Sequence, residues 1–217
     1  ISRRNWPTLR VVPQSDGGNE KKTGWDANPP KDWGEEQTRR IALEIRRLRG
    51  RRSAQWLANR TSELGYAISR SVISDLEIAR RRYITTAEVT ILARALDTAP
   101  IALIYPFPYY GDEIEVLPSS EFEKIVAVQW FTGKQGIYLE DLMSMVDQAN
   151  YHSNLLRLNR ARQAWDLNDR KEQLILEIRW MRQRRRDGED VGSTARLDDL
   201  EADIAYQEAR IDELKKL

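Results

Sequence analysis

Arginine is the residue type whose placement most suggests chemistry, because twelve arginines and no lysine lie within residues 39–82. The same stretch holds four acidic residues, so its net charge is +8 at neutral pH. Residues 111–217 hold 16 basic and 22 acidic residues, which gives a net charge of −6. A basic block beside an acidic one is typical of a module that binds a polyanion, followed by a module with another task. The plainer alternative is solvated helix surface with an uneven charge.

Side chains suited to catalysis are scarce, since the 217 residues include no cysteine and a single histidine, His152. Disulfides and thiolate zinc sites are thereby excluded, along with most imidazole chemistry. The carboxylates are scattered, and no phosphate-cradling loop or nucleophile–base set accompanies them. We therefore expect a protein that is not an enzyme and has no metal, cofactor or small-molecule ligand. The sequence has no apolar run of about 18 residues and no leading signal peptide, so we expect a cytoplasmic protein without a membrane segment.

The spacing of apolar residues predicts an all-α architecture in four parts. Residues 1–34 contain few aliphatic side chains and several glycines and prolines, which predicts a flexible N-terminal arm with tryptophans that pin parts of it. Residues 35–106 predict a domain of five short helices. Residues 107–137 predict a linker with a short strand at 113–117 and a short helix, which Ser120 and Glu123 would begin as a capping box. Residues 138–217 predict a long helical hairpin or coiled coil.

Two serines mark the starts of adjacent short helices in the stretch 53–82, SAQWLANRTSELGYAISRSVISDLEIARRR. This stretch resembles the XRE/Cro-repressor-like helix-turn-helix family. Its first helix and turn match at Ser53, Leu57, Ala58 and Gly65, and its recognition helix matches at Ser69, Arg70, Ser71, Ile73, Ser74, Leu76 and Glu77. The resemblance extends over residues 35–106, and it implies a five-helix, lambda-repressor-like DNA-binding domain of an actinobacterial or phage regulator.

The resemblance implies that the helix at 69–79 enters the major groove of double-stranded DNA. Ile73 and Leu76 would face inward, which leaves four polar side chains for the bases: Arg70, Ser71, Ser74 and Asp75. Arginine can donate twice to guanine, and aspartate can accept from cytosine. Expected phosphate contacts come from the adjacent Arg80, Arg81 and Arg82 and from Arg51, Arg52, Arg60, Ser53, Gln55 and Ser69.

Departures from the family pattern affect both ends of the motif. The customary glutamine early in the first helix falls at Ala54, with Gln55 one position later. The customary Asn-Gly after the recognition helix is Ile78-Ala79. A left-handed residue is costly for these side chains, so we expect this helix to continue for another turn.

The last predicted helix has an apolar seam at alternating spacings of three and four residues, with Gln207 as its polar member. The residues expected to self-associate are Leu197, Leu200, Ile204, Ile211 and Leu214, with Leu174, Ile178 and Met181 on the preceding helix. That preceding helix is longer by some twenty residues. We expect a second copy to cover the excess, which includes Leu155, Leu156, Leu158 and Trp165, and to form a homodimer. The alternative is that the helix at 120–131 folds back over it.

These features together predict a sequence-specific transcriptional repressor of the bacterial or phage type, located at the nucleoid when bound to DNA. The alternative is an adaptor or antitoxin-like module. Its C-terminal helices would bind a different protein, and its DNA binding would serve autoregulation.

Overall fold

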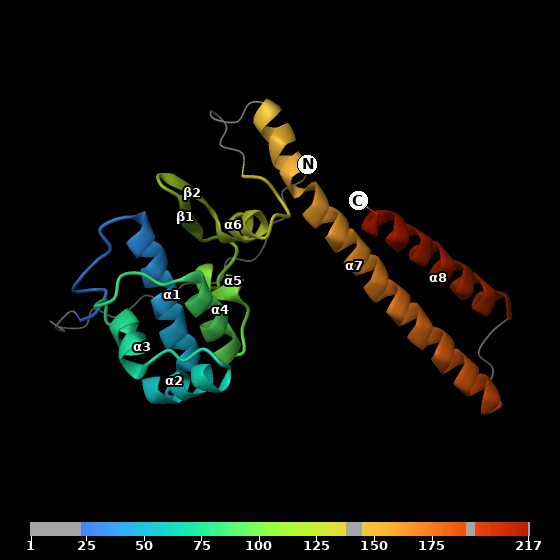
Figure 1. Cartoon of the computed structure of the whole chain (residues 1–217), viewed down its shortest axis with the longest axis horizontal. Coiled ribbons are helices and arrows are strands. Elements are labelled where there is room, and N and C mark those ends of the chain that lie inside the picture. Colours follow the sequence, from blue (N-terminus) through green and yellow to red (C-terminus); the bar gives the residue numbers. More distant parts are fainter. Residues whose placement is uncertain (1–22, 138–144, 190–193, 217) are drawn as a thin grey trace. The chain divides into compact units, whose positions relative to one another are not determined.

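The computed structural model describes residues 23–137, 145–189 and 194–216. It is mostly helical, with 66% helix, and these residues form eight helices and one small two-stranded sheet (Figure 1). The expected mostly helical fold is confirmed at this level. The chain divides into two compact units, one ending at Lys124 and the other beginning at Ile125. None of the described helices is both long and apolar enough to cross a membrane.

The first unit contains five short helices within a few residues of the expected positions. They are α1 (Trp33–Arg49), α2 (Ala54–Glu63), α3 (Arg70–Glu77), α4 (Thr86–Ala95) and α5 (Pro100–Ile104). The first four begin at a side-chain cap: Asp32, Ser53, Ser69 and Thr85 each accept a hydrogen bond from a backbone N–H three residues later. Thr85 and Glu88 complete a capping box. These caps satisfy N–H groups that have no partner inside the helix, so they fix where each helix starts.

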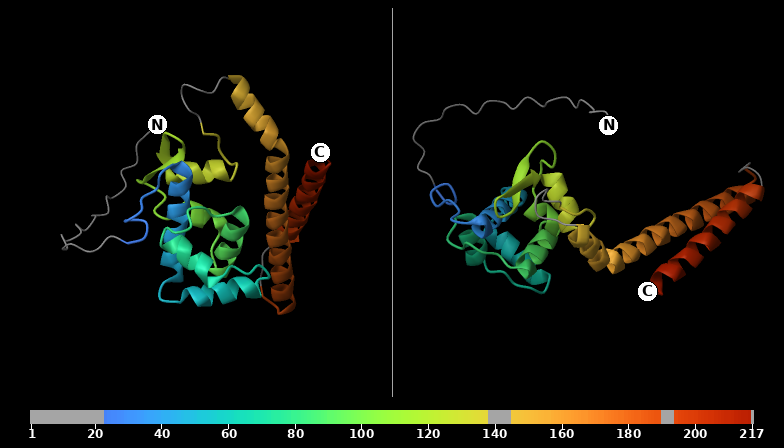
Figure 2. Two further views of the ribbon diagram at one scale, coloured as in Figure 1. Left: turned by 60° about the vertical axis from the view of Figure 1, so that its left-hand side comes forward. Right: turned by 90° about the horizontal axis from the view of Figure 1, so that it is seen from above.

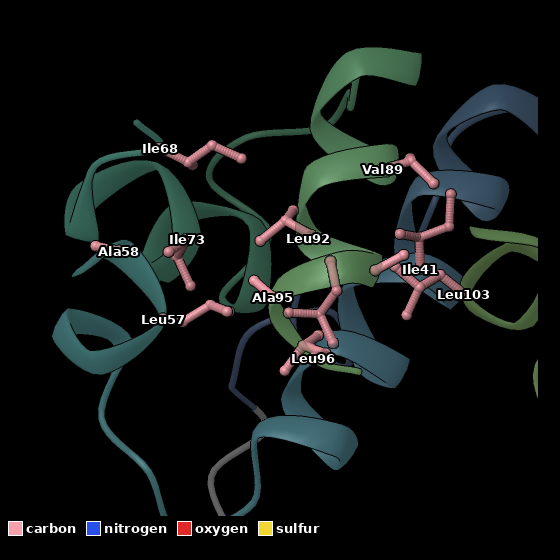
Figure 3. Packing of buried hydrophobic residues seen from close by; sticks show 12 residues of the cluster. Ile41, Leu57, Ala58, Ile68, Ile73, Val89, Leu92, Ala95, Leu96 and Leu103 are labelled. Carbon is pink, nitrogen blue, oxygen red and sulfur yellow. The ribbon is translucent and has the colours of Figure 1, made fainter. Parts of the chain in front are cut away.

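One hydrophobic core joins all five helices. Ile41 of α1, Leu57 of α2, Ile73 of α3, Leu92 of α4 and Leu103 of α5 are all buried in it (Figure 3). Each helix therefore contributes one apolar side to a common centre, and polar side chains are left on its outer side.

The end of α3 differs from the prediction. The helix ends at Glu77, and Ala79 adopts the left-handed conformation, with φ of 61°. The expectation that the helix continues for another turn is therefore wrong. Ala79 is buried in a small cluster with Trp25, Ala42 and Leu76, so packing offsets the conformational cost that is ordinary for a residue with a Cβ.

The segment after α5 forms a β-hairpin. Strands β1 (Glu113–Leu117) and β2 (Ser120–Glu123) pair antiparallel, and α6 (Lys124–Phe131) follows directly. The strand expected at 113–117 is confirmed, but the capping box is wrong because Ser120 and Glu123 lie in β2. Ile114 and Val116 of β1 are buried, and Phe122 pairs with Ile114. Pairing with β1 therefore places Ser120 and Glu123 in a strand and not at the start of a helix. The indole of Trp33 and the guanidinium of Arg40 both donate to Glu115 O, each at 3.3 Å, so the first part of the expected linker is attached to α1.

The second unit is dominated by two long antiparallel helices, α7 (Met145–Arg186) and α8 (Thr194–Lys215), which lie side by side in both views of Figure 2. The expected residues 138–144 of the first helix lie outside the described residues. Three ion pairs, Arg182–Glu201, Glu177–Arg196 and Lys171–Glu208, connect the two helices. The expected hairpin is therefore present.

The apolar seam of α8 packs inside its own chain. Leu197 lies in one buried cluster with Ile178 and Met181 of α7, and Leu200 and Ile204 pack against it. Ile211 is buried as well, while Leu174 and Leu214 are half-buried. The eight residues that were expected to self-associate therefore form the inside of the hairpin. A second copy would reach them only if the hairpin opened, so that expectation is corrected.

The residues after α6 cover part of the longer helix. Arg162 of α7 donates hydrogen bonds to the carbonyl oxygens of Thr132 and Gly133, and the hydroxyl of Tyr151 donates to Gln135 O at 2.9 Å. A Cβ at Gly133 would meet the side chains of Leu155 and Leu158 at about 3.5 Å. These contacts come from residues 132–135, the turn that follows α6, and not from the helix at 120–131 that was named as the alternative cover.

Candidate nucleic-acid interface

The turn between α2 and α3 is held by a buried threonine. The hydroxyl of Thr61 donates to Ala58 O at 2.8 Å and accepts from Ile68 N at 3.0 Å. Gly65 adopts a φ of 87° directly after α2, a conformation that glycine reaches without steric cost. Ile68 is buried in the core. The start of α3 is therefore fixed relative to α2 by hydrogen bonds as well as packing.

The outer side of α3 carries the four side chains that were expected to contact bases. Arg70 and Ser71 are exposed, and Ser74 and Asp75 are half-buried. Ile73, Leu76 and Glu77 are buried on the opposite side. The Ser71 hydroxyl lies 2.8 Å from the Ser69 hydroxyl, and Arg70 has no hydrogen-bond or ion-pair partner among the described residues. The structure thus brings the four predicted residues together on one surface.

A bidentate ion pair connects α1 with the end of α3. Arg49 donates to both carboxylate oxygens of Glu77, at 2.8 and 2.7 Å, and both side chains are largely buried. The hydrogen bond to Glu77 raises the pKa of Arg49 above its ordinary value. Sequence reasoning treated Glu77 as a motif residue and missed this pair, because its partner lies 28 positions away.

Arg81 and Arg82 are used inside the domain and do not face outward as predicted. Arg81 donates to both oxygens of Glu88, at 2.6 and 3.0 Å. Arg82 donates to Glu35 at 2.5 Å and to the carbonyl oxygens of Asn28 and Pro29. Both guanidinium groups already have carboxylate partners, so the expectation that they contact phosphate is corrected.

The residues before α1 form a strap against the end of α3, defined as residues 23–32. Trp25 is 3% exposed, and its indole N–H donates to Leu76 O at 2.9 Å. The guanidinium of Arg82 lies 4.9 Å from the centre of the Trp25 ring. This part of the predicted flexible arm therefore belongs to the folded domain. Trp25 and Arg82 lie together beside the C-terminal end of α3.

The same contacts set the charge state of Glu35 in the first turn of α1. A hydrogen bond from Arg82, followed by one from the backbone N–H of Lys31, lowers the pKa of Glu35 from 4.5 to about 2. The ion pair that attaches α1 to Arg82 is consequently complete at neutral and mildly acidic pH.

Five other residues expected to contact phosphate already have partners within the domain: Arg52, Arg60, Ser53, Ser69 and Gln55. Arg52 donates to the carbonyl oxygens of Leu48 and Arg49 and lies over the Trp56 ring at 3.9 Å. Arg60 pairs with Glu63 at 3.3 Å, an exposed pair that competing ions separate readily. Ser53 and Ser69 act as helix caps, and Gln55 donates to Asn59 at 2.8 Å.

Three of the predicted arginines remain available to an anion. Arg51 is exposed and, like Arg70, has no hydrogen-bond or ion-pair partner in the part of the chain that the structure describes. Arg80 is 76% exposed, and its nearest carboxylate oxygen, on Asp75, is 3.9 Å away. Arg70 and Arg80 flank α3 at its start and just beyond its end, so the available cations lie beside the polar side chains of that helix.

The comparisons with known proteins place no further constraint on this surface. The chain matches no protein-family model, no curated protein and no solved structure.

Proposed function

We propose that the chain is a helix-turn-helix transcriptional repressor that inserts α3 into the major groove of double-stranded DNA. The observation that carries the proposal is the division of α3 into a buried apolar side and an outer side with Arg70, Ser71, Ser74 and Asp75. These side chains offer donors and acceptors of the kind that base edges accept in the major groove.

The proposal also draws on how firmly α3 is held. Thr61 fixes its start, while Arg49 and the Trp25 strap fix its end. A helix that reads bases must present its side chains in one register, because each bidentate contact depends on position and direction. A helix of eight residues is marginally stable by itself, so α3 depends on these contacts to keep its conformation and position.

Phosphate contacts in this proposal come from the arginines without an internal partner. Arg51 and Arg80 would neutralise phosphates and fix the helix on the duplex without reading sequence. The helix starts at Ser53 and Ser69 would add backbone N–H groups toward the phosphates.

The test is selection of binding sites from random double-stranded DNA, followed by affinity measurements at several salt concentrations. We expect one enriched sequence and affinity that falls steeply as salt rises, because bound phosphates release counterions. Arg70→Ala should cost about 1–3 kcal/mol at one base position and relax the preference there. Arg80→Ala should weaken all sequences equally and reduce the salt slope by about one.

The matched control is Arg94→Ala, which removes an exposed arginine of α4 that pairs with Asp97. It should leave both affinity and preference unchanged. A parent protein that enriches no sequence, or an Arg70→Ala variant with the parent's preference at every position, would contradict the proposed reading by α3.

A further inference from the structure

Helix α7 carries a second apolar surface, separate from the one beneath α8. Leu158, Trp165, Leu176 and Trp180 are separated by 7, 11 and 4 residues. These intervals correspond to about two, three and one turns of a helix with 3.6 residues per turn, so the four side chains form a single stripe. Trp165 is 75% exposed, Leu176 61% and Trp180 55%, and Leu158, which lies beside Gly133, is 43% exposed.

The stripe lies on the side of α7 that faces away from α8. Ile178, buried in the contact with α8, is two residues from both Leu176 and Trp180. Two residues rotate a helix by about 200°, so these side chains point in nearly opposite directions. The helix that covers one side of α7 therefore cannot cover the stripe of the same chain. The stripe has an apolar part at each end, and the exposed Asp169 and Glu172 lie between Trp165 and Leu176; exposed apolar residues gathered on one side of a helix are typical of a protein interface.

We propose that this stripe is the surface through which two copies of the chain associate, with their α7 helices antiparallel about a two-fold axis near residues 169–171. A two-fold interface needs a surface that complements itself when turned end to end. Leu158 and Trp180 form the two ends of the stripe, and Trp165 and Leu176 lie between them. Turning the stripe end to end places each tryptophan opposite a leucine of the second copy.

The apolar area of the stripe fits a dimer better than a small ligand. A tryptophan buries about 150–250 Å², so the exposed parts of the two tryptophans and two leucines amount to roughly 400 Å² per copy. A standard interface removes about 800 Å² per partner, of which somewhat more than half is apolar. The four side chains thus supply most of the apolar part, and the polar residues that flank them supply the rest.

Charges near the proposed axis distinguish a second copy from a different partner. Asp169 lies one turn after Trp165, and Glu172 lies one turn before Leu176; both are exposed. Two copies would bring four carboxylates close together, which weakens association until salt screens the repulsion. Self-association should therefore strengthen as salt rises, whereas a basic protein partner would bind more weakly.

The first experiment is sedimentation of the full chain at micromolar concentration in low and high salt. We expect a monomer–dimer equilibrium that shifts toward dimer in high salt. Leu176→Glu with Trp180→Glu should weaken the dimer roughly tenfold or more, because both positions lie inside the contact. Asp169→Asn with Glu172→Gln should strengthen it. The matched control is Tyr206→Glu, which changes an exposed aromatic residue of α8 and should have no effect.

The second experiment uses the absence of native cysteine. In an Asp169→Cys variant the two thiols of a dimer would face each other across the axis, so mild oxidation should give a covalent dimer. Tyr206→Cys should not. Circular dichroism of each variant checks that the hairpin is intact.

Three outcomes would overturn the proposal: a parent chain that stays monomeric in high salt, a dimer that survives the double glutamate variant, or a dimer that Asp169→Asn with Glu172→Gln weakens. The last would indicate a contact with basic residues. Neither experiment involves DNA, so a failure here is distinguishable from a failure of the reading by α3.

Discussion

The five short helices and the long hairpin use their apolar residues differently. Each helix of the first unit has one apolar side, and the common core covers it. Helix α7 has two apolar sides, of which α8 covers one and leaves Trp165, Leu176 and Trp180 exposed. A domain whose helices are completed by their neighbours is specified within one chain. The hairpin leaves one apolar side of α7 exposed, so residues of its own two helices do not bury all of its large apolar side chains.

The two regions also use arginine differently. In the first unit, Arg49 and Arg81 each donate to both oxygens of a largely buried glutamate. In the hairpin, Arg182 and Arg196 pair with exposed glutamates across the two helices. Exposed pairs add little stability because water and salt compete with them, whereas a buried pair that loses one member leaves a charge without a partner. Arginines of the first unit should therefore be harder to replace.

The largest expected difference between the regions is in the cost of removing a leucine. Leu92→Ala removes a side chain with no exposure at the centre of the core, and such a change costs about 2–5 kcal/mol of unfolding free energy. Leu176→Ala removes an exposed side chain from α7 and should change the stability of the monomer by no more than about 0.5 kcal/mol. Native-state hydrogen exchange measures each unit separately. Equal losses in the two variants would contradict the comparison.

A smaller effect is expected from the ion pair between α1 and α3. Arg49→Ala leaves Glu77 without its partner and should cost about 1.5–3 kcal/mol, the usual value of hydrogen bonds to a charged group. Arg51→Ala, two residues away and without a partner among the described residues, is the matched control and should have little effect on stability. Exchange of the α3 amides would report the difference. If both variants exchanged like the parent, Arg49 would not hold α3.

The smallest effect concerns pH and the strap. The folded state lowers the pKa of Glu35 from 4.5 to about 2, so its ion pair with Arg82 stabilises the fold above pH 4.5. That contribution is lost as the pH falls through this range toward 2, because Glu35 becomes protonated. Glu35→Gln lacks the charge at every pH. The parent should therefore be more stable than this variant at neutral pH, and the difference should shrink toward pH 2 in unfolding measurements. A difference that stays constant between these pH values would contradict the assignment.

Sequence reasoning located the elements whose signals are local. Ser53 and Ser69 cap α2 and α3 as expected, and the glycine at 65 lies just past the end of α2. The core positions Leu57, Ile73 and Leu92 followed from helical spacing. Caps and spacing act within a few residues, so a single sequence contains the information they need.

Features that depend on distant residues were missed. The indole of Trp25 reaches Leu76 across 51 positions, and Arg82 reaches Glu35 across 47. The net charge of residues 39–82 overstated the free positive charge, because Glu35 and Glu88, which engage Arg82 and Arg81, lie outside that window. The candidate surface of α3 could be predicted, but the distinction between structural and available arginines required the folded arrangement.

The attachment of Trp25 has a practical consequence for where this domain can be cut. A fragment that started at the first helix, at Trp33, would keep all five helices of the core but lose the indole that covers Ala79 and Leu76. Its α3 would end on an uncovered carbonyl and a left-handed alanine. A fragment meant to keep the end of α3 intact must therefore include Trp25, eight residues ahead of the first helix.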